Sequence, residues 1–355
     1  MSWRAMEKVL VVGSGLTGAA SACFLREACP EMSVVIWDKA RGIGGRMSTS
    51  RSPKDSECTV DLGAQYITAT PEYRQKHSRL YEDLLSMGIL SPLAAKIEGD
   101  SSVNGTNYVT PQGSSSLVKY FIQKSGVQVM RDHQINSVSL GDKGQITVGT
   151  LSGVRDQFDG VLLTMPVPQI LQLQGDIKSI IDKQSEVKRK LEAVRYSSRF
   201  CLGLFYKAGA KLGVPWSAKY IPDHDCLRFV SIDSRKRGRD EVTSAPSVVV
   251  HTSVPFGVNN LERDKEEIAP EIYDHFTKMF PEFPEPEHIK GHKWRYSQVS
   301  QGYEGSPGYL ILQENPFIIC GGDGFAHSKF DGCIDSTEAV VSAFIKQQKK
   351  LKADL

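Results

Sequence analysis

The stretch from Lys8 to Gly18, KVLVVGSGLTG, joins an apolar run of strand length to three glycines spaced as G-x-G-x-x-G. A helix rich in small residues is predicted to follow over Thr17–Cys29, and a second buried strand over Val34–Trp37. Strand, tight turn, helix and strand in this order begin a doubly wound α/β domain, in which the turn binds the phosphates of a dinucleotide. The start of the chain is therefore predicted to bind a dinucleotide.

The residues of this turn have separate predicted roles. Gly13 permits the tight turn, Gly15 lets the backbone approach a pyrophosphate, and Gly18 lets the helix pack closely on the strand. Together with Thr17 they are the predicted contacts, because the first N–H groups of the helix and the helix dipole face the negative charge of the phosphates.

An acidic residue stands at the distance that such a turn requires. Asp38 lies 20 residues beyond Gly18, at the end of the second predicted strand. Its carboxylate would accept hydrogen bonds from ribose hydroxyls and would disfavour a 2′-phosphate. Lys39, beside it, is included in the predicted cofactor site.

The segments that follow indicate which dinucleotide is bound. DKARGIGGRMST covers residues 38–49, and DLGAQYIT covers residues 61–68. This pairing resembles the flavin amine oxidase superfamily, with a shift of one residue and with Asp38 where that group usually has glutamate. The resemblance implies a resident FAD. The residues it assigns to the flavin pyrophosphate or ring edge are Gly45 and Arg46, and those it assigns to the isoalloxazine are Gln65 and Tyr66.

Two later segments extend the resemblance. In VQVMRDHQI, residues 127–135, a backbone group near Ile135 would meet the adenine. In CGGDGFAHSKFDGCI, residues 320–334, Asp323 would bind near the ribityl chain or the pyrophosphate. The N–H groups of Cys333 and Ile334, opening the last helix, would point at the flavin N1–C2=O edge, where reduced flavin carries its negative charge.

Similarity from about residue 37 to residue 334 narrows the resemblance to one branch of the superfamily. WDKA, TPQG, RFVSID, HTSVPFGV and KWRYSQV are among the segments that carry it. The branch implies an oxidase that converts isomeric dihydronicotinamide dinucleotides, with the hydride misplaced on the ring, to NAD(P)+. The electrons would pass to O2 and give hydrogen peroxide. A flavin amine oxidase, or a secreted signalling or binding protein that retains the fold, are the alternatives.

Cysteine positions separate the chain from amine oxidases that tether their flavin. No cysteine lies between residues 227 and 319, the segment that supplies such a tether, so noncovalent FAD is expected. Cys333 follows Gly332, where amine oxidases place a tyrosine of their amine-binding cage. This difference disfavours the amine oxidase alternative.

The implied fold is a two-domain α/β flavoprotein of the p-hydroxybenzoate hydroxylase or amine oxidase type. It combines a Rossmann-like FAD domain with an inserted antiparallel-sheet substrate domain, for which Arg199–Tyr206 and Ser247–Val254 are predicted strands. A terminal helix is predicted over Ile334–Lys350. The predicted FAD domain comprises residues 1–70, 104–170 and 296–355, and the predicted substrate domain comprises residues 71–103 and 171–295.

Hydride transfer from a dihydropyridine requires no strong base, because the product is aromatic. The inserted domain should therefore supply a flat pocket with aromatic edges and a few groups that recognise an amide. Tyr220, His251 and Trp294, on or beside its predicted strands, are the catalytic candidates. Ordinary core packing is the competing interpretation for each of them.

The composition of the chain limits which partners and which cellular compartment are expected. A net charge of +2 over 355 residues offers no field that would steer nucleic acid, and no apolar run reaches the roughly 18–20 residues of a membrane span. The seven cysteines are odd in number and scattered, which predicts neither a disulfide framework nor a metal site. We expect a cytoplasmic monomer that meets a small-molecule substrate and O2, with secretion without a cleaved signal peptide as the alternative.

One dense run of charge, DSRKRGRDE at residues 233–241, is basic at its centre and acidic at both ends. Short charge blocks usually lie in water. A solvated loop is therefore expected there, rather than a signal that binds polyanions.

Overall fold

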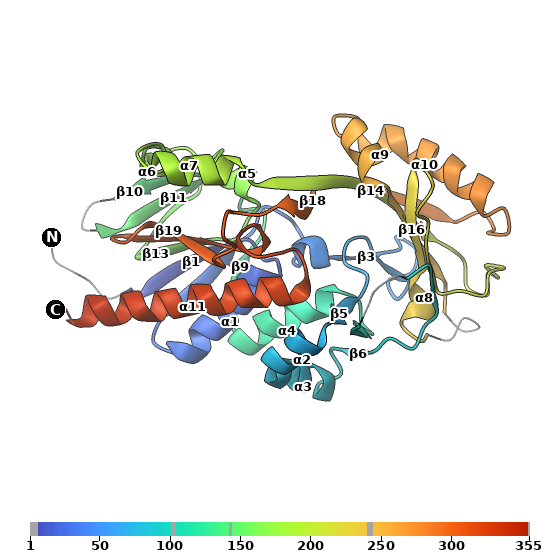
Figure 1. Ribbon diagram of the computed structural model, residues 1–355, viewed down its shortest axis with the longest axis horizontal. Coiled ribbons are helices and arrows are strands. Elements are labelled where there is room, and N and C mark those ends of the chain that lie inside the picture. Colours follow the sequence, from blue (N-terminus) through green and yellow to red (C-terminus); the bar gives the residue numbers. More distant parts are fainter. Residues whose placement is uncertain (1–5, 101–103, 142–143, 240–243, 354–355) are drawn as a thin grey trace. The chain divides into compact units, whose positions relative to one another are not determined.

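A computed structural model describes residues 6–100, 104–141, 144–239 and 244–353 of the chain (Figure 1). The chain forms two compact units. The first unit comprises residues 1–45, 118–195 and 299–355, and the second comprises residues 46–117 and 196–298. Each unit is thus assembled from segments that are far apart in the sequence.

The boundaries of these units differ from those of the predicted domains. Residues 46–70 and 104–117 belong to the second unit, where Val60 and Leu62 join the apolar core of its sheet. Residues 171–195 belong to the first unit, because their short helices pack on its strands. The apolar side chains of each segment decide where it is buried, and a linear division of the sequence does not show this.

The first unit centres on a six-stranded sheet in the order β19-β20-β13-β1-β2-β9. Five neighbouring strands run parallel, and β19 is antiparallel at the edge. Because β1 has a neighbour on each side, its apolar run is buried, as expected of a parallel strand. The strands are β1 (Lys8–Val12), β2 (Ser33–Trp37), β9 (Gln128–Met130), β13 (Gly160–Leu163), β19 (Tyr309–Gln313) and β20 (Phe317–Gly321).

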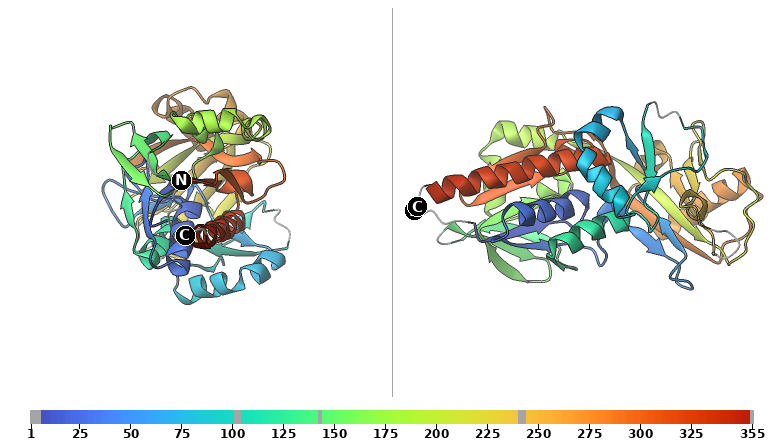
Figure 2. Two further views of the ribbon diagram at one scale, coloured as in Figure 1. Left: turned by 90° about the vertical axis from the view of Figure 1, so that its left-hand side faces the viewer. Right: turned by 90° about the horizontal axis from the view of Figure 1, so that it is seen from below.

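Two helices of the first unit, α1 (Leu16–Ala28) and α11 (Phe330–Ala353), pack side by side (Figures 1 and 2). Helix α1 carries alanine and glycine at positions that are fully buried, so α11 can approach it closely. Helix α11 begins at Phe330, one turn earlier than the predicted start at Ile334.

Smaller elements complete the first unit. Three antiparallel strands form a separate sheet, and short helices flank it. These elements are β10 (Ile135–Leu140), β11 (Ile146–Thr150), β12 (Arg155–Phe158), α5 (Val167–Ile170), α6 (Asp176–Asp182), α7 (Ser185–Glu192) and η3 (Asp323–Phe325), and α4 (Ser115–Ser125) crosses the boundary between the units.

The second unit is built on a six-stranded sheet in the order β18-β14-β17-β16-β15-β7. Strands β14, β17, β16 and β15 pair antiparallel in turn, which confirms the predicted antiparallel sheet, and β7 joins β15 in parallel. The strands are β7 (Ile97–Glu98), β14 (Arg195–Phe205), β15 (Ala218–Tyr220), β16 (Leu227–Ile232), β17 (Ser247–Thr252) and β18 (His288–Gln301).

The two faces of this sheet differ. Ile268, Ile272 and Phe276 of α10 (Lys265–Met279) pack on one face, in a core with side chains such as Leu202 and Val250. The other face, which we call the aromatic face, carries two of the candidate aromatic residues and the segment after Cys58. Its members include Val60, Leu62, Cys201, Tyr220, Phe229, Val249 and Trp294.

The segment after Cys58, which packs on the aromatic face through Val60 and Leu62, forms two short strands joined by a loop. The shorter elements of the second unit are η1 (Gly45–Met47), β3 (Thr49–Arg51), β4 (Thr59–Asp61), β5 (Ile67–Ala69), α2 (Pro71–Lys76), α3 (Ser78–Ser86), β6 (Ser91–Pro92), β8 (Thr106–Val109), α8 (Asp233–Lys236) and α9 (Val254–Asn259). Residues 62–66 form a loop between β4 and β5. Of the helices within the described residues, none is both long and apolar enough to cross a membrane.

Candidate functional site

The glycine loop, residues 13–18, connects β1 to α1 through a turn that requires glycine. Gly13 has a φ of 104°, which residues with a side chain rarely adopt, and its N–H donates to the carbonyl of Trp37 over 2.8 Å. A Cβ on Gly18 would overlap the carbonyl oxygen of Gly13. Both glycines are therefore needed for the packing of the loop itself.

Gly15 differs, because no protein contact requires it to be glycine. Its backbone is extended, with a φ of −76°, and a Cβ built on it would meet no atom within 4 Å. It is the N-cap of α1, where no side chain caps the helix. An open space over uncapped amides fits the pyrophosphate of a dinucleotide, which would accept hydrogen bonds from those N–H groups.

A second pair of glycines lies against this loop. Gly44 donates its N–H to the carbonyl of Ser14 over 3.0 Å, and a Cβ on Gly45 would lie 3.5 Å from Gly15 Cα. Both have positive φ, 117° for Gly44 and 54° for Gly45. The predicted cofactor residues Gly15 and Gly45 are thus neighbours in the first unit.

Asp38 is buried and already binds the glycine loop. Its Oδ2 accepts hydrogen bonds from the N–H and the hydroxyl of Ser14, each at 2.6 Å, and its Oδ1 accepts the N–H of Ala40 at 2.7 Å. A carboxylate offers about four acceptor positions, so capacity for a ribose hydroxyl is left. Lys39, next in sequence, is exposed. The sequence did not predict a role for Ser14, because it occupies a position of the motif at which any residue is allowed.

Thr17 and Ile135 are positioned by packing. Thr17 is buried in α1, and its carbonyl accepts a hydrogen bond from Thr337 Oγ1 of α11 at 3.4 Å. Ile135 is the first residue of β10 and pairs with Thr150 of β11. Thr17 therefore belongs to the contact between the two helices, and Ile135 to the edge of the three-stranded sheet.

Asp323 and Cys333, both in the last segment of the first unit, make different contacts: Asp323 through its side chain and Cys333 through its backbone N–H. Asp323 is buried after Gly322, whose φ is 117°, and its Oδ2 accepts the hydroxyl of Ser328 at 2.6 Å. The N–H of Cys333 donates to the carbonyl of Lys329 at 3.2 Å, inside the first turn of α11. The predicted contact of this amide with the flavin N1–C2=O edge stays a prediction, as does that of Ile334, a buried residue one position further into the helix.

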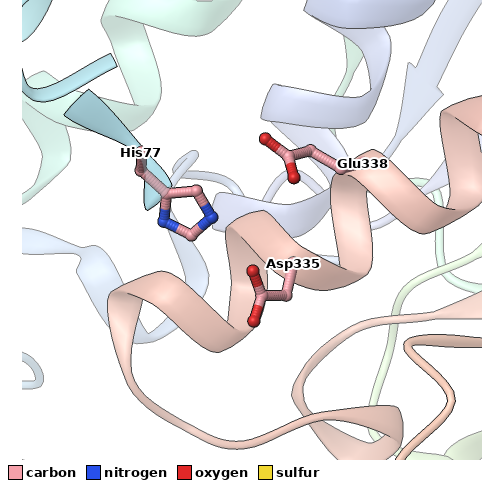
Figure 3. A group of neighbouring side chains, drawn as sticks. All are labelled: His77, Asp335 and Glu338. Carbon is pink, nitrogen blue, oxygen red and sulfur yellow. The ribbon is translucent and has the colours of Figure 1, made fainter. Parts of the chain in front are cut away.

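Helix α11 also carries two acidic residues, Asp335 and Glu338, on consecutive turns (Figure 3). His77, drawn in the same figure, belongs to the second unit, where it lies between α2 and α3. Two carboxylates on one helix are an ordinary feature of a solvated surface. We assign no metal to them.

In the second unit, Arg46 supports the loop of residues 62–66 through its backbone. Its carbonyl accepts the N–H of Ala64 at 3.0 Å, and a Cβ on Gly63 would overlap that same carbonyl. Its guanidinium Nη1 lies 3.4 Å from the carbonyl of Ser297. The double glycine before Arg46 thus leads into a residue that fixes the position of the next motif.

Gln65 holds its own loop. Its Nε2 donates to the carbonyls of Asp61, at 2.6 Å, and Gly63, at 3.0 Å, while its Oε1 accepts Lys236 Nζ at 2.9 Å. These bonds use both amide hydrogens and one acceptor position. Its polar atoms therefore serve the loop, and any contact with a flavin ring would come from its carbon atoms or its remaining lone pair.

A buried network of charge lies next to Gln65. Lys236 Nζ is 2.6 Å from Asp233 Oδ1, and Arg237 Nη2 is 2.8 Å from Asp233 Oδ2 and 2.6 Å from Asp61 Oδ2. Burial alone would raise the pKa of Asp61, yet Arg237 and Lys236 hold it below its usual value. All four groups are almost completely buried, so the solvated loop expected over residues 233–239 is wrong; residues 240 and 241 lie outside the described part of the chain.

The sequence did not predict this network of buried charges, because its partners are distant in the chain. Asp61 and Arg237 are 176 residues apart. The one available signal was the acidic residue that precedes the basic run at helical spacing, Asp233 with Lys236 and Arg237. A charge run flanked by an acid at i−3 and i−4 can fold back on that acid instead of entering water.

Two of the catalytic candidates bind one carbonyl. His251 Nε2 and Trp294 Nε1 each lie 2.9 Å from the carbonyl oxygen of Leu62. Both nitrogens donate, so the Leu62 carbonyl holds the two rings at the edge of the 62–66 loop. Burial, followed by the charge of Arg199, lowers the pKa of His251 to about 3. This histidine is therefore neutral near pH 7.

The third candidate, Tyr220, is paired with Tyr66. Their hydroxyl oxygens are 2.6 Å apart, and burial raises the pKa of both groups. In such a pair one hydroxyl donates to the other, and the second keeps a proton that it can donate elsewhere. The pair thus presents one O–H donor and lone-pair acceptors on the aromatic face.

Strand register lines up four residues across this face. Cys201 of β14 is opposite His251 of β17, His251 is opposite Phe229 of β16, and Phe229 is opposite Tyr220 of β15. The rings of Phe229 and Tyr220 have centroids 4.8 Å apart, and those of Phe229 and His251 are 6.0 Å apart. We call these four residues the aromatic row. The structure thus brings Tyr220, His251, Trp294, Tyr66 and Gln65 together in one unit.

Comparison with known proteins places the chain in a family. Residues 11–84 match the model of the NAD(P)-binding Rossmann-like domain, and residues 77–342 match that of flavin-containing amine oxidoreductases. Renalase from Mus musculus is 46% identical over 338 residues, which cover 95% of this chain and 98% of that protein.

Solved structures show the same fold at low sequence identity. A provisionally assigned protoporphyrinogen oxidase from Exiguobacterium sp. 255-15 superposes with a TM-score of 0.72 at 12% identity, over 96% of this chain and 99% of that one. The A394C mutant of putrescine oxidase superposes with a TM-score of 0.69 at 11% identity, over 96% and 99%.

The family match, the extent of the renalase match and the glycine loop agree on the cofactor. The chain is an FAD-dependent oxidoreductase with the predicted two-domain α/β architecture, and the branch of the superfamily that its sequence resembles is renalase. This protein belongs to the renalase family of the flavin-containing amine oxidoreductases.

Proposed function

We propose that this protein oxidises isomeric dihydronicotinamide dinucleotides to NAD(P)+ and uses O2 as the electron acceptor. The observation that carries the proposal is the geometry of the aromatic face, on which the rings of Phe229 and Tyr220 have centroids 4.8 Å apart and the hydroxyls of Tyr66 and Tyr220 are 2.6 Å apart. Burial lowers the pKa of His251 and raises the pKa of Tyr66 and of Tyr220, so this face is uncharged at these three residues near neutral pH. An ammonium substrate must lose a proton before oxidation, whereas a dihydropyridine gives up hydride directly and becomes aromatic.

The first unit would hold the cofactor. The amides at the start of α1 would bind the pyrophosphate over Gly15, and Asp38 would accept a ribose hydroxyl while it keeps the loop rigid through Ser14. FAD held there would supply the redox chemistry: an acceptor for the hydride of the substrate, which would leave as NAD(P)+, and a donor of two electrons to O2, which with two protons would give hydrogen peroxide. Asp323, Thr17, Ile135, Gly45 and Lys39 are the further residues that we assign to the cofactor.

The second unit would meet the substrate. The aromatic row offers a flat apolar surface, and the Tyr66–Tyr220 pair offers a donor and an acceptor that suit the carboxamide of a dihydronicotinamide. His251 and Trp294 would act mainly by holding the 62–66 loop through the Leu62 carbonyl. We assign Arg46, Gln65 and Tyr66 to the flavin side of this site, as the family resemblance implies.

A flavin amine oxidase is the second candidate, because the family model that covers residues 77–342 is named for amine oxidation. Against it stands the character of the aromatic face. Arg199 brings positive charge to the candidate site and interacts electrostatically with Tyr220 and His251. A cation there disfavours a protonated amine, whereas a dinucleotide brings the negative charge of its pyrophosphate.

Anaerobic mixing of the holoenzyme with each class of substrate separates the two functions. We expect the visible absorbance of the oxidised flavin to bleach with isomeric dihydronicotinamide dinucleotides and to stay unchanged with amines. β-NADH, with its hydride at the ordinary position, is the matched control, and admission of O2 should restore the colour with one hydrogen peroxide per turnover. Bleaching by amines and not by the isomers would exclude the proposal.

We further propose that FAD is bound noncovalently by a cytoplasmic monomer. All seven cysteines lie in the described residues and none forms a disulfide, which suits a reducing compartment. Acid precipitation should release the flavin into the supernatant, and a flavin that stays in the pellet would contradict noncovalent binding. Cell fractionation and light scattering test the compartment and the monomer, with secretion without a cleaved signal as the competing outcome.

A further inference from the structure

Two arginines lie on the same side of the aromatic row, Arg199 on β14 and Arg228 on β16. Arg199 precedes Cys201 by two positions on β14, and alternation along a strand puts both on the same face. Arg228 is the extra residue of a bulge in β16, since Leu227 pairs with Thr252 while Phe229 pairs with the adjacent His251. Bulges redirect side chains and are common beside active sites.

The bulge has a visible effect on packing. Leu227 lies in the core under α10, whereas Phe229, two positions later, lies on the aromatic face. In a regular strand both would share one face. The inserted residue, Arg228, therefore follows neither face by alternation, and its charge acts on Tyr220 and on Arg199.

Arg199 has no acidic partner within the described residues. Its Nη1 donates to the carbonyl of Thr252 at 3.0 Å, and it is half-buried. Burial, followed by the like charge of Arg228, lowers its pKa. Lys236 and Arg237 are also buried, but each has a carboxylate within 2.8 Å. Arg199 differs from these two buried cations because no described carboxylate pairs with it.

Arg228 is similarly placed. Its Nη1 lies 3.4 Å from the carbonyl of Pro222, a long bond to a neutral group, and no described carboxylate pairs with it. The acid that acts on this corner is Asp100, which influences Tyr66 and Tyr220. Two like charges that approach each other at a partly buried place destabilise the protein unless a ligand supplies the opposite charge.

We propose that Arg199 and Arg228 form a phosphate subsite that binds the pyrophosphate linkage of the dinucleotide substrate beside the aromatic row. The inference rests on the proposed function, and it identifies which part of the substrate the arginines recognise. The ring itself is excluded, because oxidation gives it a positive charge that a nearby guanidinium would oppose. Phosphate oxygens match the planar donor fork of arginine and can use two of them at once.

Binding to the holoenzyme, measured by titration calorimetry, tests the subsite without turnover. The ligands are NAD+, nicotinamide riboside, which lacks phosphate, and inorganic pyrophosphate as competitor. For Arg199→Met and Arg228→Met we expect the Kd for NAD+ to rise on the order of 10- to 100-fold while the Kd for the riboside changes by less than about twofold. Arg199→Lys keeps the charge and should recover part of the affinity.

Arg295→Met is the matched control. Arg295 lies on β18, next to Trp294 and therefore on the opposite face, and it makes two hydrogen bonds of 2.9 Å to Glu262. We expect it to leave the Kd for NAD+ unchanged. FAD content and Tm of each variant are measured alongside; removal of the unmatched Arg199 charge should leave Tm equal or higher, which a merely structural arginine would not do.

The outcomes separate the subsite from the proposed function. An equal loss of NAD+ and riboside affinity in Arg199→Met, unchanged NAD+ affinity, or no binding of NAD+ and pyrophosphate to the wild type would overturn the subsite. If the isomeric dinucleotides fail to bleach the flavin and pyrophosphate still binds through Arg199, the phosphate subsite stands and the proposed substrate falls. If the isomers bleach the wild-type flavin and both variants bind NAD+ as the wild type does, the proposed substrate stands and the subsite falls.

Discussion

The glycine loop of the first unit and the aromatic face of the second are built by opposite means. The loop works through backbone: Gly13, Gly15 and Gly18 lie within six residues and expose amides at the start of one helix. The aromatic face works through side chains that come from at least six strands and one loop. A backbone site leaves a motif in the sequence, whereas a site assembled by strand register leaves scattered residues.

The second unit contains a further contrast, between matched and unmatched buried charge. Asp61, Asp233, Lys236 and Arg237 form a neutral group that holds the 62–66 loop, while Arg199 and Arg228 have no described acidic partner. The first arrangement serves the fold, since each of its charges lies beside an opposite charge inside the protein. The second makes sense for a ligand that brings the missing charge.

The largest expected effect concerns the matched group. Asp233→Ala leaves Lys236 and Arg237 buried without their shared carboxylate, and we expect a loss of about 3–5 kcal/mol in the free energy of unfolding. Urea denaturation measures it. Asp274→Ala removes an exposed partner of Lys278 and should cost below about 1 kcal/mol. Equal effects of the two substitutions would show that the buried group contributes no more than a surface pair.

Gly18→Ala and Gly15→Val separate packing from cofactor binding. The added Cβ at Gly18 overlaps the Gly13 carbonyl, so the free energy of unfolding should fall by about 1–3 kcal/mol. The side chain at Gly15 enters open space, so the apoprotein should keep its stability and lose FAD. Flavin absorbance per protein and apoprotein Tm measure the two. A Gly15→Val protein that retains full FAD would refute the placement of the pyrophosphate.

Acidification should weaken the aromatic face through His251. Above pH 6.5 this histidine is neutral in both the folded and the unfolded chain; below it, the unfolded chain binds a proton that the folded protein refuses until about pH 3. The free energy of unfolding should therefore fall as the pH drops from 6.5 towards 3, by at most about 1.4 kcal/mol per pH unit for this group.

The matched variant is His251→Gln, which can still donate to the Leu62 carbonyl but does not titrate. Its free energy of unfolding should depend less on pH between 4 and 6.5 than that of the wild type. The same comparison applies to flavin reduction, whose rate should show no step at the usual histidine pKa. Identical pH dependence of stability in the two proteins would rule out a buried neutral His251.

The smallest effect is expected from the tyrosine pair. Tyr66→Phe or Tyr220→Phe removes one of two hydroxyls 2.6 Å apart and should cost about 0.5–1.5 kcal/mol in the free energy of unfolding. If the pair binds the substrate carboxamide, KM should rise while kcat changes little. Steady-state kinetics of both variants and of the double variant measure this. A fall in kcat at unchanged KM would place the hydroxyls at the reacting atoms instead.

The sequence predicted more of the first unit than of the second. The strand, turn and helix around Gly13–Gly18 follow from local patterns, because neighbouring residues form them. The terminal helix α11 begins at Phe330 and not at the predicted Ile334, since its start depends on which residues of the preceding loop join the helix. The burial of the charges at Asp233–Arg237 was not predicted, because their partner Asp61 is remote in the chain.

By itself, the sequence determined the nucleotide loop, the acidic residue after the second strand, the antiparallel inserted sheet and the family. Each of these is encoded by residues close together or by a pattern repeated along one strand. The tertiary structure alone decided that His251 and Trp294 share the Leu62 carbonyl, that Tyr66 meets Tyr220, and that Arg199 and Arg228 lie on the same side of one row. The physical reason is strand register: a shift of one residue turns every side chain to the other face, and register is settled only when the whole sheet packs.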